Sequence, residues 1–188
     1  RSSDLENLGK SIDEAFIYFN DEPEAAASLA QVHRAILPTG QTVAVKIKRP
    51  GIDSQVEADI QIMHQLANFV DNNTDYFQVI KATEIVEEFE RQMMRELDFV
   101  EEFLAVKKFR ADYERDKTVY VPRVYSEYTT RNILVLEFIH GQKISDVING
   151  EGERFDKSVV NLRTADFIMS QLFINGYFHA DPHPGNFM

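Results

Sequence analysis

Two apolar runs joined by a turn signal place the strongest constraint on how this chain of 188 residues folds. The runs are Val32 to Leu37 and Thr42 to Ile47, and Pro38 to Gln41 lies between them with the sequence Pro-Thr-Gly-Gln. Runs of this kind around a Pro- and Gly-containing turn are typical of a β-hairpin. The hairpin would carry Lys46 on its second strand, directly after Val-Ala-Val. The fold is therefore expected to contain an antiparallel sheet.

Helical periodicity covers most of the remaining sequence. Apolar residues recur every three or four positions, which predicts amphipathic helices, over residues 5–19, 52–70, 79–113 and 160–178. The third region is long enough to be one helix or a helix broken twice, and Gly176 suits the end of the fourth. Two runs rich in β-branched and aromatic residues, Thr118 to Tyr125 and Arg131 to Phe138, predict strands that complete the sheet. The expected fold class is α+β.

Composition narrows the class of protein. The formal net charge of −11 argues against general nucleic-acid binding, because phosphate backbones attract basic surfaces. The absence of Cys excludes disulfides and thiolate metal sites. No stretch reaches the roughly 20 apolar residues of a membrane span, and the polar start lacks the apolar region of a signal peptide. A soluble, cytoplasmic chain is therefore expected, with 44% hydrophobic residues to form a core.

Two motifs point to phosphoryl transfer. The segment Phe178 to Phe187 reads F-H-A-D-P-H-P-G-N-F and contains the spacing H-x-D-x-x-x-x-N of a kinase-type catalytic loop. In such a loop Asp181 would accept the proton of the attacking hydroxyl, and Asn186 would hold a magnesium ion. The alternative is a simple turn built from Asp-Pro and Gly-Asn. Lys46 lies in V-A-V-K, close to the V-A-I-K strand whose Lys pairs with nucleotide phosphates, although an isolated strand lysine would merely be solvated.

An alanine-rich stretch stands where an ordinary protein kinase has its glycine-rich loop. The motifs A-A-A-S-x-A-Q-V-H, V-A-V-K-x-x-R-P-G, R-E-L-D-F-x-x-E and F-H-A-D-P-H-P-G-N follow one another over residues 20–188. This order resembles the UbiB (AarF) family of atypical kinases. The resemblance implies a protein kinase-like fold, with an N-lobe and its extra helices in residues 1–139. Residues 140–188 would begin a helical C-lobe, and a D-F-G segment with a second metal-binding Asp is expected beyond Met188.

The resemblance also implies roles for individual residues. Lys46 would contact the nucleotide phosphates and Glu102 would be its ion-pair partner, although Glu101 is adjacent and the bare pattern is that of a solvated helix face. Backbone near Glu137 and Ile139 would bind the adenine edge, as in a kinase hinge. Further nucleotide contacts would come from Ala25, Ala26, Ala27, Ser28 and Ala44. Ala25 to Ser28 could instead be merely the start of a helix or strand.

Glu96 and Asp98 match an E-x-D motif of the family. The resemblance implies that they contact an N-terminal extension with a K-x-G-Q motif, which covers the active site and is expected outside this chain. In the alternative they are surface charges that pair with Arg91 or Arg95. Because Asp98 and Glu102 are four residues apart, they share one helix face if the helix is continuous there.

Three functions fit these motifs. The first is an ATP-binding, magnesium-dependent atypical kinase or ATPase, with the family's implied role in ubiquinone or other isoprenoid-quinone pathways. Its partners would be an adenine nucleotide and a lipid or quinone-precursor acceptor or membrane surface, with attachment through parts outside this chain. The second is a small-molecule phosphotransferase of the aminoglycoside or choline kinase type, against which A-A-A-S and E-L-D-F argue. The third is a non-catalytic binding module switched by nucleotide.

Overall fold

The computed structural model describes residues 11–74, 81–150, 155–177 and 187–188. The chain divides into two compact units. The first lies within residues 1–107 and 122–138, and the second within residues 108–121 and 139–188. An antiparallel sheet with accompanying helices confirms the α+β class. The functional lobes expected at residues 1–139 and 140–188 stay a prediction.

The first unit is built on a five-stranded antiparallel sheet. Its centre is the predicted hairpin, β3 (Ala30–Ile36) and β4 (Thr42–Lys48), which is confirmed. On the far edge of β4 lies β5 (Ile133–Glu137), and on the far edge of β3 lie two short strands, β1 (Tyr18–Phe19) and β2 (Ala25–Ala26).

The two faces of the sheet bury different apolar clusters, because successive strand residues point to opposite sides. Val43 and Val45 belong to the larger cluster, which also contains Ala15, Phe16, Ala35, Leu37, Tyr125, Ile133 and Val135. Lys46 directly follows Val45 in β4, so its side chain points to the other face of the sheet. It lies opposite Val32 and Leu134, and this face carries a smaller cluster of Ala30, Phe99 and Leu134. The strand pattern thus places Lys46 beside α4 (Phe99–Asp112), which supplies Phe99.

The helix predicted over residues 5–19 is wrong beyond Ala15. The described part is the short α1 (Ile12–Ala15), which Ser11 and Glu14 close with a capping box. Phe16 is extended and packs into the larger core cluster, and Tyr18 and Phe19 pair with β3 as β1. The apolar residues after Ala15 thus form a buried anchor, Phe16, and an edge strand, β1, although their spacing is that of a helix. Residues 1–10 lie outside the described part.

The strand predicted over Thr118 to Tyr125 is also wrong. Only Val124 forms a bridge there, to Leu136 of β5. Pro122 lacks a backbone N–H for a ladder, and the Val121 carbonyl accepts a hydrogen bond from the Arg110 side chain at 2.7 Å. A short 3-10 helix, Ser126–Tyr128, follows. The second predicted strand is confirmed as β5.

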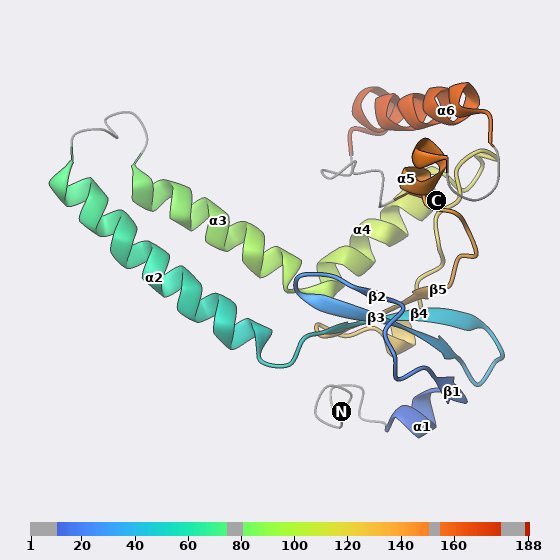
Figure 1. Ribbon diagram of the computed structural model, residues 1–188, viewed down its shortest axis with the longest axis horizontal. Helices are drawn as coiled ribbons and strands as arrows, with labels where there is room; N and C mark the ends of the chain where they lie inside the picture. The colour runs from blue at the N-terminus through green and yellow to red at the C-terminus, as the bar shows by residue number, and fades with distance from the viewer. Residues whose placement is uncertain (1–10, 75–80, 151–154, 178–186) are drawn as a thin grey trace. The chain divides into compact units, whose positions relative to one another are not determined.

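The chain between the hairpin and β5 is mainly helical, as Figure 1 shows. The predicted helix over residues 52–70 is confirmed as α2 (Ile52–Asn73), and Gly51 begins it at φ +75°, a conformation that favours glycine. The region predicted as helical over residues 79–113 breaks between α3 (Ala82–Glu96) and α4. Asp98 lies in this break, one residue before α4, so Asp98 and Glu102 do not belong to one helix. Residues 75–80 lie outside the described part.

The ends of α2 and α3 are tied together by Asp71. Its carboxylate accepts hydrogen bonds from the backbone N–H groups of Ala82 and Thr83 at 2.8 and 3.1 Å, and from the Thr83 hydroxyl at 2.9 Å. The Asp71 side chain, which belongs to α2, thus caps the N-terminus of α3. Lys81, the N-cap residue of α3, makes no capping hydrogen bond with its own side chain. Midway along the pair, His64 Nε2 lies 2.8 Å from Glu90 Oε2.

Replacing Asp71 by Ala should loosen the N-terminus of α3. Desolvation raises the pKa of Asp71, but the hydrogen bonds from Ala82 and Thr83 and the charge of Lys81 outweigh it, so the pKa lies below its ordinary value of 3.8. A lowered folded-state pKa means that the carboxylate stabilises the fold above about pH 3.8 and that this contribution is lost as pH falls through the lowered pKa. We expect faster amide hydrogen exchange at Ala82 and Thr83 in the variant at pH 7, as measured by NMR. Equal exchange in Asp71→Ala and in the control Asp59→Ala would contradict this role.

The second unit is helical in its described residues. It contains α5 (Ile144–Asn149), which the sequence pattern did not predict, and α6 (Lys157–Ser170), which Asp156 caps. A π-helical turn, Gln171–Asn175, continues α6 to Gly176 at φ +60°, which confirms the predicted end of this helix. The Tyr113 hydroxyl lies 2.6 Å from Ser170 Oγ and joins the end of α4 to α6. None of the described helices combines the length and apolar character needed to cross a membrane.

Candidate functional site

An ion pair between β4 and α4 is the centre of the candidate site. Lys46 Nζ lies 2.5 Å from Glu102 Oε2, although the two residues are 56 positions apart in the sequence. Glu102 is in the first turn of α4, and Glu101 beside it makes no such contact with Lys46. The pair expected from the family resemblance is thus present in the structure. Its side chains are 25% and 38% exposed, so that a ligand can reach them.

An aromatic ring lies beneath this ion pair. Lys46 Nζ is 4.8 Å from the centroid of Phe99, a distance at which the negative face of the ring attracts an ammonium group. Phe99 is 1% exposed and packs with Ala30 and Leu134. The Lys46 ammonium therefore lies on a fixed apolar floor with a carboxylate at its side. Sequence reasoning did not find Phe99, because an aromatic residue at helical spacing looks like ordinary core.

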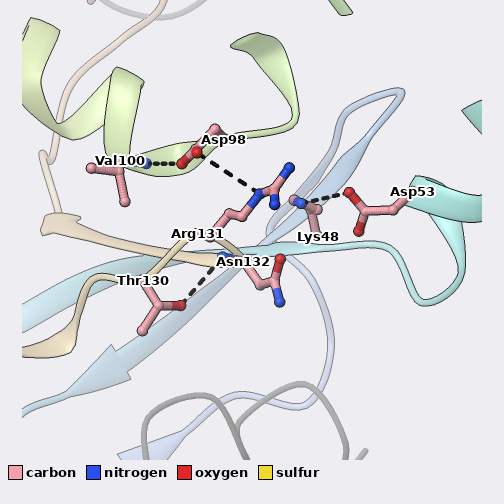
Figure 2. Close-up of polar contacts among 7 residues, drawn as sticks. All are labelled: Lys48, Asp53, Asp98, Val100, Thr130, Arg131 and Asn132. Carbon is pink, nitrogen blue, oxygen red and sulfur yellow. Dashed lines mark hydrogen bonds and ion pairs between the residues drawn. The ribbon is translucent and has the colours of Figure 1, made fainter. Parts of the chain in front are cut away.

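Asp98 fixes the start of α4. Its Oδ1 accepts a hydrogen bond from the Val100 N–H at 3.0 Å, and its Oδ2 lies 3.8 Å from Arg131 Nε (Figure 2). The Phe99 N–H donates to the Arg131 carbonyl at 3.2 Å. These contacts hold the first turn of α4, which carries Glu102, against the segment that leads into β5.

The alternative for the E-x-D motif was that its carboxylates pair with Arg91 or Arg95 of α3. For Asp98 the structure shows a different ionic partner, Arg131. Arg91 pairs with Glu88 instead, three residues earlier in α3. Glu96 is exposed at the last position of α3. The regulatory role of Glu96 and Asp98 stays a prediction.

A second lysine on the same face of β4 also has a carboxylate partner. Lys48 Nζ lies 2.8 Å from Asp53 Oδ1 in the first turn of α2, and only 5% of the Lys48 side chain is exposed (Figure 2). The Lys48 N–H donates to the Asn132 carbonyl at 3.0 Å. Sequence reasoning missed this pair, although the K-x-K spacing on a strand places both lysines on one face. The pair joins the end of β4 to α2.

The alanine-rich stretch forms a strand and a turn instead of a helix. Ala25 and Ala26 make up β2, which pairs with Val32 and Gln31 of β3. The Ala27 N–H donates to the Ala30 carbonyl at 2.9 Å and closes the turn. Residues 25–28 are exposed, so that a ligand can reach them. Ala44 lies on the Lys46 face of β4, opposite Leu136.

The predicted adenine-binding segment begins at the end of β5. The Glu137 N–H donates to the Arg123 carbonyl at 2.8 Å, and the Phe138 N–H donates to the Thr42 carbonyl at 3.1 Å. The Glu137 carboxylate accepts from the Arg123 N–H at 3.0 Å. An adenine acceptor could use these two donors only by displacing bonds within the first unit. Ile139 belongs to the second unit, and its adenine contact stays a prediction.

Asp181 and Asn186 lie outside the described residues, and their catalytic and metal-binding roles stay predictions. Within residues 11–74, 81–150, 155–177 and 187–188, no cluster of three or more His, Asp or Glu side chains could hold a metal ion. The carboxamide oxygen of Asn186 is of the chemical type that magnesium accepts.

Comparison with known proteins supports the kinase-like assignment. A sequence profile described as the ABC1 atypical kinase-like domain matches residues 4–188. The chain is 38% identical over 180 residues to a probable protein kinase UbiB of Cellvibrio japonicus, covering 96% of this chain and 33% of that protein. It is also 38% identical over 181 residues to AarF domain-containing protein kinase 1 of Gallus gallus, covering 96% and 34%.

A solved structure shares the fold. Rv3197 of Mycobacterium tuberculosis, determined with erythromycin, matches with a TM-score of 0.84 and 29% sequence identity over 98% of this chain and 46% of that one. The chain thus spans about a third of the length of these two curated relatives. Because the profile covers nearly the whole sequence, the resemblance is confirmed, and the chain belongs to the ABC1 family of atypical kinase-like domains, together with the UbiB and AarF domain-containing protein kinases.

Proposed function

We propose that this protein binds ATP with magnesium and acts as an atypical kinase or ATPase of the UbiB type. The observation that carries the proposal is the ion pair of Lys46 with Glu102 beside the alanine-rich hairpin, which consists of β2, the turn of residues 27–29 and β3. Kinase-type enzymes hold a strand lysine with a helix carboxylate so that its ammonium binds nucleotide phosphates. Family membership supports the same role for these two residues.

Each residue of the described site has a distinct task in this mechanism. Lys46 Nζ donates to phosphate oxygens and offsets their negative charge. Glu102 orients the Lys46 ammonium, and the Phe99 ring beneath the ammonium keeps it from moving further into the core. The exposed residues 25–28 would lie next to the phosphates, and Ala44 would pack against the adenine ring. Methyl groups in this loop restrict its backbone more than the glycines of a protein kinase would, so phosphate closure differs.

The chemical step belongs to the C-terminal motif. Asp181 would take or orient the proton of the attacking hydroxyl, and Asn186 would supply an oxygen ligand to magnesium. Magnesium, when bound, neutralises charge on the phosphates. A second metal-binding Asp is proposed in the part of the protein that follows this chain.

The acceptor proposed for the phosphoryl group is a lipid or quinone precursor, or water. Membership of the family that includes the UbiB kinases supports this choice, and with it we propose a role in ubiquinone or other isoprenoid-quinone metabolism. We place the protein in the cytoplasm, with membrane attachment through regions outside this chain.

Nucleotide binding tests the proposal most directly. We expect calorimetric titration of ADP or ATP into the full-length protein to show magnesium-dependent binding. Lys46→Ala should weaken it by about ten- to hundredfold, because a charge-assisted hydrogen bond to phosphate is lost. The surface variant Lys117→Ala should bind as the unaltered protein does. Absence of binding at millimolar nucleotide in a folded protein would contradict the proposal and favour a scaffold.

A further inference from the structure

Arg49 holds the tip of the alanine-rich hairpin through three hydrogen bonds. Its Nε and Nη2 donate to the Ala27 carbonyl at 3.2 and 3.0 Å. Its backbone N–H donates to the Leu29 carbonyl at 3.0 Å. The two carbonyls belong to the turn between β2 and β3, so one residue fixes both sides of that turn.

These bonds join the hairpin tip to the strand that carries Lys46. Arg49 follows Lys48, the last residue of β4, and is three positions after Lys46. On its other side, Pro50 and the left-handed Gly51 turn the chain into α2. The Arg49 backbone is therefore held between a strand and a helix, and its side chain has a fixed base from which to reach Ala27.

The geometry of these contacts suits arginine better than lysine. The guanidinium is planar and presents several N–H donors in one fork, and here two of them meet one carbonyl oxygen. A lysine ammonium at the same place is a flexible point donor. Without the side chain, backbone contacts alone would hold this segment. They are the two register pairs of β2 with β3, the Ala27 N–H bond to the Ala30 carbonyl and the bond from the backbone N–H of residue 49 to the Leu29 carbonyl.

We propose that Arg49 is a positioning residue that presets the conformation of the alanine-rich hairpin tip and thereby sets nucleotide affinity. The inference rests on the proposed nucleotide site. A loop that is already ordered loses less conformational entropy when a ligand binds, so the complex forms more tightly. Arg49 acts through the Ala27 carbonyl and does not itself touch the reacting atoms.

Two measurements on the full-length protein test this role. In the absence of nucleotide, hydrogen exchange of the Ala27 N–H should be about five- to tenfold faster in Arg49→Ala, since two exposed hydrogen bonds to the tip are lost. In calorimetry with magnesium and ADP, the dissociation constant should rise by a similar factor. Arg49→Lys should restore part of both. Arg91→Ala, which removes an arginine bound only within α3, should change neither.

The outcomes separate this inference from the proposed function. Nucleotide binding and tip exchange that are unchanged in a folded Arg49→Ala protein would overturn the inference and leave the proposed function standing. Faster exchange with unchanged affinity would overturn the positioning role, because Arg49 would then be only structural. If the unaltered protein binds no nucleotide, the proposed function and the affinity role fail together. Arg49→Ala could instead lower both the unfolding temperature and the nucleotide affinity, with Arg49→Lys restoring neither. The loss of affinity would then reflect a damaged fold, and the inference would be overturned as well.

Discussion

Replacing Asp181 by Asn is expected to reduce ATP turnover by at least about a hundredfold, the usual lower range for loss of a general base. An amide cannot accept the proton of an attacking hydroxyl at neutral pH, although it nearly matches the carboxylate in size. Nucleotide affinity should change far less, because Lys46 and the alanine-rich hairpin bind the ligand in the proposed mechanism. Release of phosphate from ATP by the full-length protein, measured beside magnesium-dependent ADP binding, separates the two effects.

The matched control for this variant is Asp166→Asn. Asp166 is exposed on α6, and its substitution removes the same charge within the same unit. Both variants should unfold at nearly the same temperature as the unaltered protein. Substantial hydrolysis that survives in folded Asp181→Asn would remove this residue from the chemistry and leave a nucleotide-binding role for the site.

The sequence pattern was enough to predict the parts of the site that lie close together in the sequence. Two apolar runs around a Pro-Thr-Gly-Gln turn predicted β3 and β4, and the observed register fixes the face of the sheet on which Lys46 lies. Glu102 is different, because its contact with Lys46 spans 56 positions. Periodicity could not prefer it over Glu101, and only the resemblance to a family selected it.

The remaining contacts depend on tertiary structure. Asp71 caps a helix that begins 11 residues later, and Lys48 finds Asp53 only because the chain turns at Pro50 and Gly51. The two wrong elements have the same origin. Apolar spacing in residues 16–19 suits a helix and also a buried anchor followed by an edge strand. The β-branched run before Tyr125 could not pair beyond one bridge, since Pro122 has no donor and Arg110 occupies the Val121 carbonyl.

Replacing Phe99 by Ala is expected to destabilise the fold by about 3–5 kcal/mol, the usual range for truncating a buried Phe. Phe99 is 1% exposed, packs with Ala30 and Leu134, and lies under the Lys46 ammonium. Its loss leaves a cavity between α4 and the sheet. Since native proteins are stable by only about 5–15 kcal/mol, the variant should unfold at markedly lower denaturant concentration.

Two comparisons isolate the buried ring as the cause. Phe99→Leu fills most of the space and should cost less than about 1.5 kcal/mol, while it removes the ring face that Lys46 contacts. Val100→Ala changes the next residue of α4, which is 40% exposed, and should have a small effect. If Phe99→Leu remains stable but binds magnesium-dependent nucleotide more weakly than Val100→Ala, the ring positions the lysine as well as filling the core. A Phe99→Ala protein as stable as Val100→Ala would contradict the packing described for α4, and with it the placement of Glu102 beside Lys46.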